Sequence, residues 1–223
     1  MGISVLSTPY GPTQAVAELT LGMILGLIRH AGTSTAEMRQ GQWTKRMGFL
    51  LSEMTVGIVG LGKVGKRLAG MLRALGGRVL GCDKALDLAW CGEHQVTPRT
   101  WGKILPEADI LCLHLPLEKE LRHLVGKREI ARMKWGSFLT NTSRGGLVDE
   151  RALYEALRSG QLAGAALDTF EEEPYHGPLR KLRNVILTPH IGSYARAGRI
   201  AMEREAAENL IGELRRRRLL KPL

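Results

Sequence analysis

Short apolar runs alternate with stretches of helical spacing along most of the chain. Residues 55–59 form a β-rich apolar run, which is typical of a parallel strand buried on both faces. Apolar residues then recur at helical spacing from Val64 to Leu75. Further strands are predicted at residues 78–82, 110–113, 138–141, 165–167 and 185–187, with helical segments between most of them, notably 150–158. This alternation favours an α/β fold with a doubly wound parallel sheet.

The segments at the two ends of the chain have a different pattern. Residues 3–7 are predicted to form a short strand that stops at Pro9. Residues 16–30 are apolar nearly all round, which indicates a buried or interface helix. A more polar helix at 36–43 and a connector at 45–53 precede the alternating region, and residues 195–216 are expected to form a long closing helix.

A glycine-rich turn follows the first strand of the alternating region. Gly60, Gly62 and Gly65 form a GxGxxG pattern that opens a helix, with Lys63 and Val64 between the last two glycines. In this context the pattern predicts a dinucleotide site, because the glycines permit a tight turn and close approach of a pyrophosphate to the helix N-terminus. The alternative is a turn without a ligand, which three correctly spaced glycines and the acid described next disfavour.

Asp83 ends the second strand of this region. Its carboxylate can accept hydrogen bonds from the ribose hydroxyls of the adenosine, and its charge would repel a 2′-phosphate. We therefore expect NAD rather than NADP as the cofactor, although the neighbouring Lys84 could soften the discrimination.

Three later strands are each followed by polar residues. The segments are Asn-Thr-Ser-Arg-Gly-Gly at 141–146, Asp-Thr-Phe-Glu-Glu-Glu-Pro at 168–174 and Thr-Pro-His-Ile-Gly-Ser at 188–193. The carboxyl edge of an open α/β sheet is where ligands bind. Each segment alone could be an ordinary loop, but their occurrence together behind a dinucleotide turn indicates one site.

With the glycine turn, these segments resemble the NAD-dependent D-isomer-specific 2-hydroxyacid dehydrogenase family. That family includes phosphoglycerate, D-lactate, glyoxylate/hydroxypyruvate and formate dehydrogenases. The resemblance covers essentially the whole chain, and its four motifs occur in the family's order; the segments His-Ile-Gly-Ser-Tyr-Ala and Lys-Arg-Met-Gly look most like phosphoglycerate-dehydrogenase-type sequences. It implies a Rossmann domain that transfers a hydride between nicotinamide and a D-2-hydroxy acid or 2-oxo acid.

The resemblance also implies roles for individual residues. Arg144 would bind the substrate carboxylate and polarise the reacting carbonyl, His190 would be the general acid/base, and Glu173 would be its partner. Glu171 and Glu172 are competing candidates, and the place of Glu173 before Pro174 and five residues after Asp168 favours it. Asp168 would hold the nicotinamide carboxamide. The further cofactor contacts implied are Thr142, Ser143, Leu115 and Pro116.

Family members have a second domain of similar topology, and this bears on the ends of the chain. Residues 1–54 are interpreted as a remnant of a flavodoxin-like substrate domain with an interface helix and connector, 55–190 as the NAD-binding domain, and 191–223 as a helix returning to the substrate domain. We expect a homodimer, as is usual in the family. We also expect the chain alone to bind NAD and to reduce 2-oxo acids poorly. The alternative is a truncated, non-enzymatic NAD-binding or regulatory interaction protein.

Composition narrows the remaining choices. Of the 223 residues, 44% are hydrophobic and 24% charged, which is ordinary for a globular protein. The three cysteines show no pairing pattern, there is no signal-peptide pattern, and the most apolar stretch, 19–28, is too short to cross a bilayer, so a cytoplasmic protein is expected. The net charge of +10 is spread out apart from residues 215–218, so no nucleic-acid partner is predicted. The histidines outside the motifs match no metal spacing.

Overall fold

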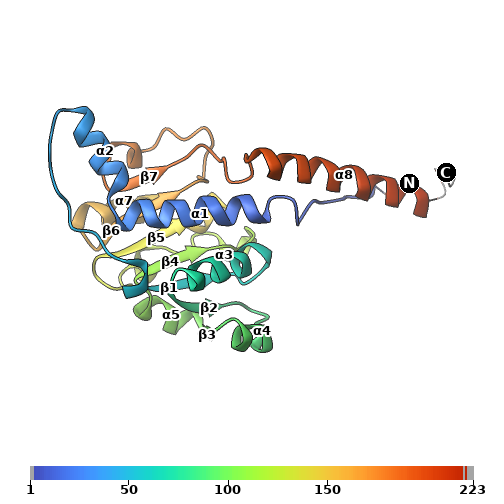
Figure 1. The fold of residues 1–223 in the computed structure, drawn as a ribbon, viewed down its shortest axis with the longest axis horizontal. Helices are drawn as coiled ribbons and strands as arrows, with labels where there is room; N and C mark the ends of the chain where they lie inside the picture. The colour runs from blue at the N-terminus through green and yellow to red at the C-terminus, as the bar shows by residue number, and fades with distance from the viewer. Residues whose placement is uncertain (1–2, 218, 220–223) are drawn as a thin grey trace.

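A seven-stranded, wholly parallel sheet forms the centre of the molecule (Figure 1). The computed structural model describes residues 3–217 and 219. The strands follow the order β3-β2-β1-β4-β5-β6-β7. Their bounds are β1 Thr55–Val59, β2 Arg78–Cys82, β3 Val96–Pro98, β4 Ile110–Leu113, β5 Ser137–Asn141, β6 Leu162–Leu167 and β7 Val185–Leu187. The predicted doubly wound α/β fold is confirmed.

The strand order reverses direction between β1 and β4. The chain runs outward from β1 to β3 and then returns to β4 on the other side of β1. Connections that leave β1 and β4 in opposite directions open a crevice above the carboxyl ends of these two strands, where open α/β sheets bind ligands. Gly60 follows β1 directly and His114 follows β4, so both lie at this crevice.

Helices cover both faces of the sheet. They are α1 Thr13–Ile28, α2 Ala31–Arg39, α3 Lys63–Ala74, α4 Leu88–Glu93, α5 Trp101–Glu107, α6 Lys127–Ile130, α7 Glu150–Ser159 and α8 Arg196–Arg216. Helices α1 and α3 pack side by side on one face, where Ile24, Leu68 and Phe138 are buried in one apolar cluster. Helices α5, α6 and α7 cover the other face around a second cluster that includes Ile104, Leu139 and Leu153. The predicted apolar runs are therefore buried from both sides.

Two of the predicted elements near the N-terminus are wrong. Residues 3–8 form no strand, since no neighbouring strand is available to pair with them, and Ile3 is 93% exposed. The polar helix spans Ala31–Arg39 instead of 36–43. Its end is set by Gly41, whose φ of 75° is a left-handed conformation that stops a helix.

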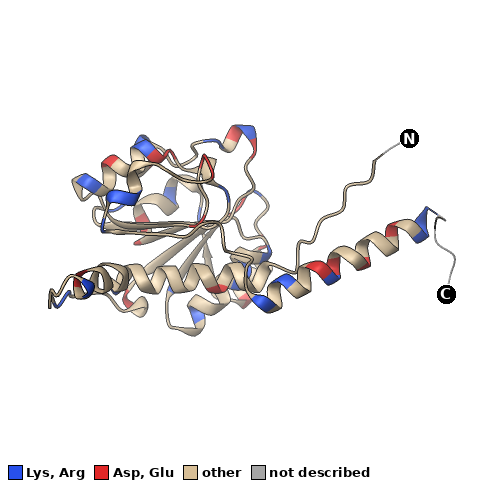
Figure 2. Cartoon of the chain, turned by 90° about the horizontal axis from the view of Figure 1, so that it is seen from above, with Lys and Arg blue, Asp and Glu red and all other residues tan. Residues whose placement is uncertain are grey.

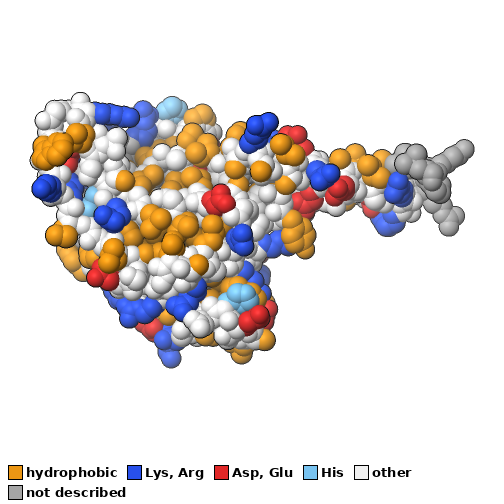
Figure 3. All heavy atoms as spheres, viewed as in Figure 1, with side chains coloured by type: hydrophobic (Ala, Val, Ile, Leu, Met, Phe, Trp, Pro, Cys, Tyr) orange, Lys and Arg blue, Asp and Glu red, His pale blue; other side chains and the backbone are white. Residues whose placement is uncertain are grey.

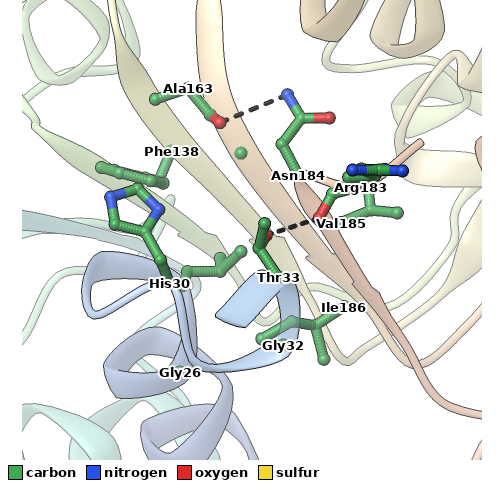
Figure 4. A pocket seen from close by; sticks show the side chains of 12 residues that line it. Gly26, His30, Gly32, Thr33, Phe138, Ala163, Arg183, Asn184, Val185 and Ile186 are labelled. Atoms are coloured by element: carbon green, nitrogen blue, oxygen red, sulfur yellow. Dashed lines mark hydrogen bonds between the residues drawn. The ribbon is translucent and has the colours of Figure 1, made fainter. Parts of the chain in front are cut away.

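The corner between α1 and α2 lies against the amino ends of β6 and β7 (Figure 4). Thr33 Oγ1 donates a hydrogen bond of 2.8 Å to the Arg183 carbonyl oxygen, and Asn184 Nδ2 lies 3.3 Å from the Ala163 carbonyl oxygen. His30, with a φ of 54°, forms the bend between the two helices. A small cavity remains there, at the sheet edge opposite the polar segments.

Helix α8 projects away from the sheet beside the N-terminal segment (Figures 1 and 2). No residue of α8 is buried, and Figure 2 shows acidic and basic residues along its length. Glu205 accepts a 2.7 Å hydrogen bond from Gly11 N–H, which links α8 to the start of α1. Arg218, the last of the four consecutive arginines, and residues 220–223 lie outside the described residues.

Within the described residues, no single helix is long and apolar enough to cross a membrane. The pair α1 and α2 satisfies length and composition only when taken together, and its two helices are bent by 64° at the break between them.

Candidate active site

The polar segments predicted from the sequence meet at one cleft at the carboxyl edge of the sheet. They come from the ends of β4, β5, β6 and β7 and from the first turn of α3. The predicted residues that line the cleft are Val64, Leu115, Pro116, Thr142, Ser143, Arg144, Asp168 and His190. It is also lined by residues that we did not predict: Pro12, Val16, His114, Gly192, Ser193 and Met202.

The glycine turn is built as its spacing predicts. Gly60 has a φ of 97°, and a Cβ there would lie 2.3 Å from the His114 carbonyl oxygen. A Cβ on Gly65 would lie 2.0 Å from the Gly60 carbonyl oxygen, so only glycine allows α3 to pack this close to the turn. A Cβ on Gly62 would meet nothing within 4 Å. The N-terminus of α3 therefore has an open side and no side-chain cap, which leaves its N–H groups free for an anion.

Asp83 follows β2 and is tied to the same turn. Its Oδ2 accepts a 2.7 Å hydrogen bond from Leu61 N–H, and its Oδ1 accepts one of 3.0 Å from Ala85 N–H. Each carboxylate oxygen has two lone pairs, so both oxygens can accept a further hydrogen bond. The carboxylate thus orders the turn and remains able to bind a ribose hydroxyl.

The loop after β5 presents Arg144. Asn141, fully buried at the end of β5, donates a 2.7 Å hydrogen bond from Nδ2 to the Arg144 carbonyl oxygen. Its Oδ1 accepts from both the N–H and the hydroxyl of Ser143. Arg144 Nη1 donates to the Ser143 carbonyl oxygen at 2.6 Å, and the rest of its exposed guanidinium is available to a ligand. The hydrogen bonds of Asn141 therefore fix the conformation of the loop that carries Arg144.

His190 and Glu173 form a direct pair. Nδ1 of His190 lies 2.8 Å from Oε2 of Glu173, and Phe170 N–H donates to Glu173 Oε1 at 3.1 Å. Burial raises the pKa of Glu173, but the hydrogen bonds from His190 and Phe170 and the charges of His190 and Arg144 outweigh it, so the pKa lies below its usual value. Among the three consecutive glutamates, it is Glu173 that reaches the histidine. A carboxylate in this place orients the imidazole and stabilises its protonated form.

Asp168 organises the turn that carries His190. It is completely buried, and its Oδ1 accepts hydrogen bonds from Thr188 Oγ1 at 2.5 Å and Ile191 N–H at 2.8 Å. Its Oδ2 accepts from Gly192 N–H at 2.7 Å. His190 itself has a φ of 55°, a conformation that these contacts hold in place.

Comparison with known proteins identifies this arrangement. The sequence pattern of the D-isomer specific 2-hydroxyacid dehydrogenase NAD binding domain matches residues 21–192. The chain belongs to the D-isomer-specific 2-hydroxyacid dehydrogenase family. NAD is accordingly the cofactor of this domain.

Relatives of the chain in this dehydrogenase family are named for several different activities. A glyoxylate reductase of Thermococcus litoralis is 38% identical over 94% of the chain, which spans 66% of that protein. A D-3-phosphoglycerate dehydrogenase of Methanocaldococcus jannaschii is 37% identical over 94% of the chain, but the chain spans 43% of it. The crystal structure of a glyoxylate reductase from Paecilomyes thermophila superposes with a TM-score of 0.88 at 32% identity, over 94% of this chain and 64% of that one. The chain thus spans slightly less than two thirds of the glyoxylate reductases.

The residues present fit a bound NAD. The open side of Gly62 and the uncapped start of α3 suit a pyrophosphate, and Asp83 lies beside them. From Val64, in the first turn of α3, the cleft continues past Leu115 and Ser143 to His190. Lys63, at the first position of α3, has its ammonium 4.3 Å from the centre of the Tyr10 ring and lies near the phosphate end. The cleft therefore connects the start of α3 with His190 of the proposed catalytic pair.

Replacing Asp83 with Ala is expected to narrow the preference for NAD over NADP. The variant loses a ribose acceptor and the charge that repels a 2′-phosphate, so NAD affinity should fall by about tenfold while NADP affinity should rise or stay unchanged. Calorimetric titration of both cofactors measures the two affinities. Glu93→Ala is the matched control, because Glu93 is exposed at the end of α4 and lies outside the turn. Equal preferences in the wild-type chain and the Asp83 variant would contradict this assignment.

Thr20 and His114 are among the residues at the site that the sequence did not predict, because their signals are weak. Thr20, within α1, is completely buried, and its hydroxyl lies 2.7 Å from the Thr142 hydroxyl. His114 precedes the predicted Leu115 directly, and its Nε2 is buried without a hydrogen-bond partner among the residues that the structure describes. Burial lowers the pKa of His114 to about 4. The one sequence feature that could have indicated His114 as a site residue is its position directly before Leu115 and Pro116.

His114 should make the domain sensitive to acid. Its pKa is lowered on folding, so its contribution to stability is complete above the unfolded pKa of about 6.5 and is lost as the pH falls toward 4. By this linkage the free energy of unfolding should drop by about 2 kcal/mol between about pH 7 and about pH 5 through this residue. Denaturant unfolding of the wild-type chain and His114→Gln, with His176→Gln as control, measures the difference. Equal pH slopes in wild type and His114→Gln would rule it out.

Proposed function

We propose that this chain provides the cofactor and proton-transfer half of a D-2-hydroxyacid dehydrogenase that reduces a small 2-oxo acid or oxidises the corresponding D-2-hydroxy acid. The observation that carries the proposal is the 2.8 Å pair of His190 and Glu173, whose histidine lines the same cleft as Arg144. The names of the relatives favour glyoxylate, hydroxypyruvate and 3-phosphohydroxypyruvate as test substrates. Structurally similar regulatory proteins could bind NAD without needing this pair.

Arg144 is proposed to bind the substrate. Its guanidinium is planar and permanently charged, so it can grip a carboxylate with two parallel hydrogen bonds and polarise the adjacent carbonyl. The Asn141 hydrogen bonds fix the backbone under it, and this fixes the direction in which the side chain leaves the loop. Thr142, Ser143, Leu115 and Pro116 would border the nicotinamide beside it, and Asp168 would hold the carboxamide.

His190 is proposed to exchange the proton. Because Nδ1 is engaged by Glu173, Nε2 is the nitrogen left to face a substrate oxygen. When bound, NADH supplies the hydride that adds to the carbonyl carbon. His190 gives its Nε2 proton to the carbonyl oxygen as the hydroxyl forms, and it regains a proton from solvent. Glu173 stabilises the imidazolium before transfer, and the same steps run backwards in oxidation.

Turnover decides between an enzyme and a binding protein. Oxidation of NADH would be followed with the three 2-oxo acids, using the chain alone and the chain fused to the N-terminal third of the Thermococcus litoralis glyoxylate reductase. We expect the fusion to reach about 1 s⁻¹ or more, an ordinary enzymatic rate, and the chain alone to be slower because one wall of the site is needed to fix substrate and exclude water. NADH binding without turnover in either form would favour the regulatory alternative.

A second copy of the chain is the proposed protein partner. Apolar side chains gather over α1 in Figure 3. Leu21 and Leu25 are only partly buried there, and the backbone of Phe49 bonds to Ile28 at the end of the same helix. The loop between α2 and β1 exposes large apolar side chains: Trp43 by 78%, Met47 by 93% and Leu50 by 58%. Both α1 and this loop thus carry apolar side chains that are exposed or partly exposed, a feature that marks protein contacts when they form one patch.

Charge on α1 should weaken this dimer. Leu21→Glu places a carboxylate in the proposed contact, and we expect the dimer dissociation constant to rise at least about tenfold, or the variant to become insoluble. Light scattering should give about twice 24.6 kDa for the wild-type chain at micromolar concentration. Leu88→Glu is the control, because Leu88 is 67% exposed on α4, at the far edge of the sheet. A well-behaved wild-type monomer would contradict the proposal.

A further inference from the structure

A second pair of histidine and glutamate, His123 and Glu171, has its carboxylate two residues before Glu173 in the same loop. His123 Nε2 is 3.0 Å from Glu171 Oε1, and Arg122 Nη2 is 2.7 Å from Glu171 Oε2. Two consecutive residues therefore hold both oxygens of one carboxylate. The Glu171 side chain is 23% exposed, compared with 57% for Arg122, so the carboxylate is the shielded partner. These residues do not line the NAD cleft and cannot act on the substrate directly.

The segment that holds Glu171 is itself fastened to the Arg144 loop. His123 N–H donates to the Gly146 carbonyl oxygen at 2.7 Å, and Val125 N–H donates to the Leu147 carbonyl oxygen at 3.0 Å. His123 has a φ of 54°, in the left-handed region that a β-carbon disfavours. Such a conformation persists where surrounding contacts fix it, and it is frequent near functional sites. The position of Arg122 and His123 is thus set by the loop that carries the substrate-binding arginine.

Glu171 lies beside the hydrogen bond that anchors Glu173. The preceding residue, Phe170, donates its N–H to Glu173 Oε1 at 3.1 Å, and its ring stacks on Tyr175 with 4.3 Å between centroids. A Cβ on Gly145 would lie 1.9 Å from the Phe170 carbonyl oxygen, so the two loops are in direct backbone contact. The orientation of residue 170 therefore affects Glu173, and residue 171 limits that orientation.

The charges around Glu171 require a cationic partner. Glu171 N–H donates to Glu150 Oε1 at 2.7 Å, which brings two carboxylates together. Burial, followed by the negative charges of Glu171 and Asp149, raises the pKa of Glu150. Arg122 and, when protonated, His123 offset this negative charge. Exposed ion pairs add little to the free energy of unfolding. We therefore expect this cluster to act mainly by fixing the local positions of the residues that it joins.

We infer that Glu171, held by Arg122 and His123, is a positioning residue for the Glu173–His190 pair. Through the cluster, the loop of Arg144 and the loop of Glu173 move as one unit. The substrate-binding charge and the proton donor then keep a fixed separation as the cleft fills. The inference deepens the proposed dehydrogenase function and rests on it, and its primary test does not require turnover.

The test determines which of the two ring nitrogens of His190 carries the proton. In the complete 223-residue chain with ¹⁵N-labelled histidine, at mildly alkaline pH, the ring ¹⁵N shifts report whether Nδ1 or Nε2 carries the proton. We expect the Nδ1–H form in the wild-type chain, and a shift in Glu171→Ala toward the Nε2–H form that a free histidine side chain prefers. His190→Gln assigns the signals. Arg122→Ala should cause a shift in the same direction.

The control is Glu172→Ala, which changes the adjacent residue. Glu172 is exposed and has no ion-pair partner in the described part of the chain, so its replacement should leave the tautomer unchanged. In the active fusion, Glu171→Ala should lower kcat by about 10- to 100-fold with an unchanged KM for NADH, as expected for a misplaced catalytic group. Glu171→Gln, which retains the shape and a hydrogen-bonding amide, should recover part of the loss.

Two results would overturn the inference. One is a Glu171→Ala protein with the wild-type tautomer and the wild-type kcat. The other is a Glu171→Ala protein that loses both NAD affinity and thermal stability. Such losses would make Glu171 a general structural residue. Wild-type protein that binds NADH and never turns over would instead defeat the proposed function, and the tautomer measurement would still decide the inference.

Discussion

Replacing His190 with Gln is expected to lower kcat by roughly 10²–10⁴, the usual contribution of a positioned general acid/base. The glutamine keeps a similar volume and a polar end but cannot deliver a proton. NADH affinity should change little, because His190 is proposed to act on the substrate, whereas the glycine turn and Asp83 are proposed to bind the cofactor. The loss should therefore be in kcat and not in cofactor binding.

Steady-state kinetics of the active fusion and calorimetric titration with NADH separate these quantities. His176→Gln is the matched control, because His176 is exposed in the loop before β7 and does not line the cleft. Near-normal kcat in His190→Gln would remove this residue from the mechanism. A parallel loss of NADH affinity would show that the turn held by Asp168 had collapsed.

Much of the fold could be predicted from local sequence because its main strands are continuous apolar runs. Strands β1, β2 and β4 are buried on both faces, so they lack the alternation that a half-exposed strand would show. The three-residue β3 was missed, since it ends in Pro98 and has two exposed residues. The expected strand at residues 3–7 has the right composition but lacks a partner, and pairing cannot be read from composition.

The candidate site was likewise predictable from the sequence only in part. Residues at strand ends could be predicted to meet, because all strands are parallel and their carboxyl ends share one edge. Contacts between distant segments could not be predicted. Examples are the hydroxyl contact of Thr20 with Thr142, 122 residues away, and the grip of Arg122 on Glu171. Such contacts depend on side-chain directions that only the packed sheet defines.

Three glycine-to-alanine substitutions in and near the glycine turn can distinguish effects on the stability of the fold from effects on NAD binding. Gly65→Ala should be the most damaging, because its methyl group would lie 2.0 Å from the Gly60 carbonyl oxygen and neither backbone can yield. Overpacking of this kind costs about 1–3 kcal/mol, and we expect it in the free energy of unfolding together with a loss of NAD affinity of roughly 100-fold.

Gly62→Ala and Gly70→Ala complete the comparison. Neither methyl group would meet a protein atom within 4 Å, so both variants should fold. Gly62 faces the open side of the turn, where the pyrophosphate must approach the backbone, and NAD affinity should fall about tenfold with stability retained. Gly70 is exposed within α3, away from the cleft, so alanine there should raise stability by about 0.5–1 kcal/mol and leave NAD affinity unchanged. Calorimetric titration and denaturant unfolding of all three measure both quantities. If Gly62→Ala bound NAD as tightly as Gly70→Ala, the pyrophosphate could not lie at the start of α3, and the path of the cofactor through the cleft would have to be redrawn.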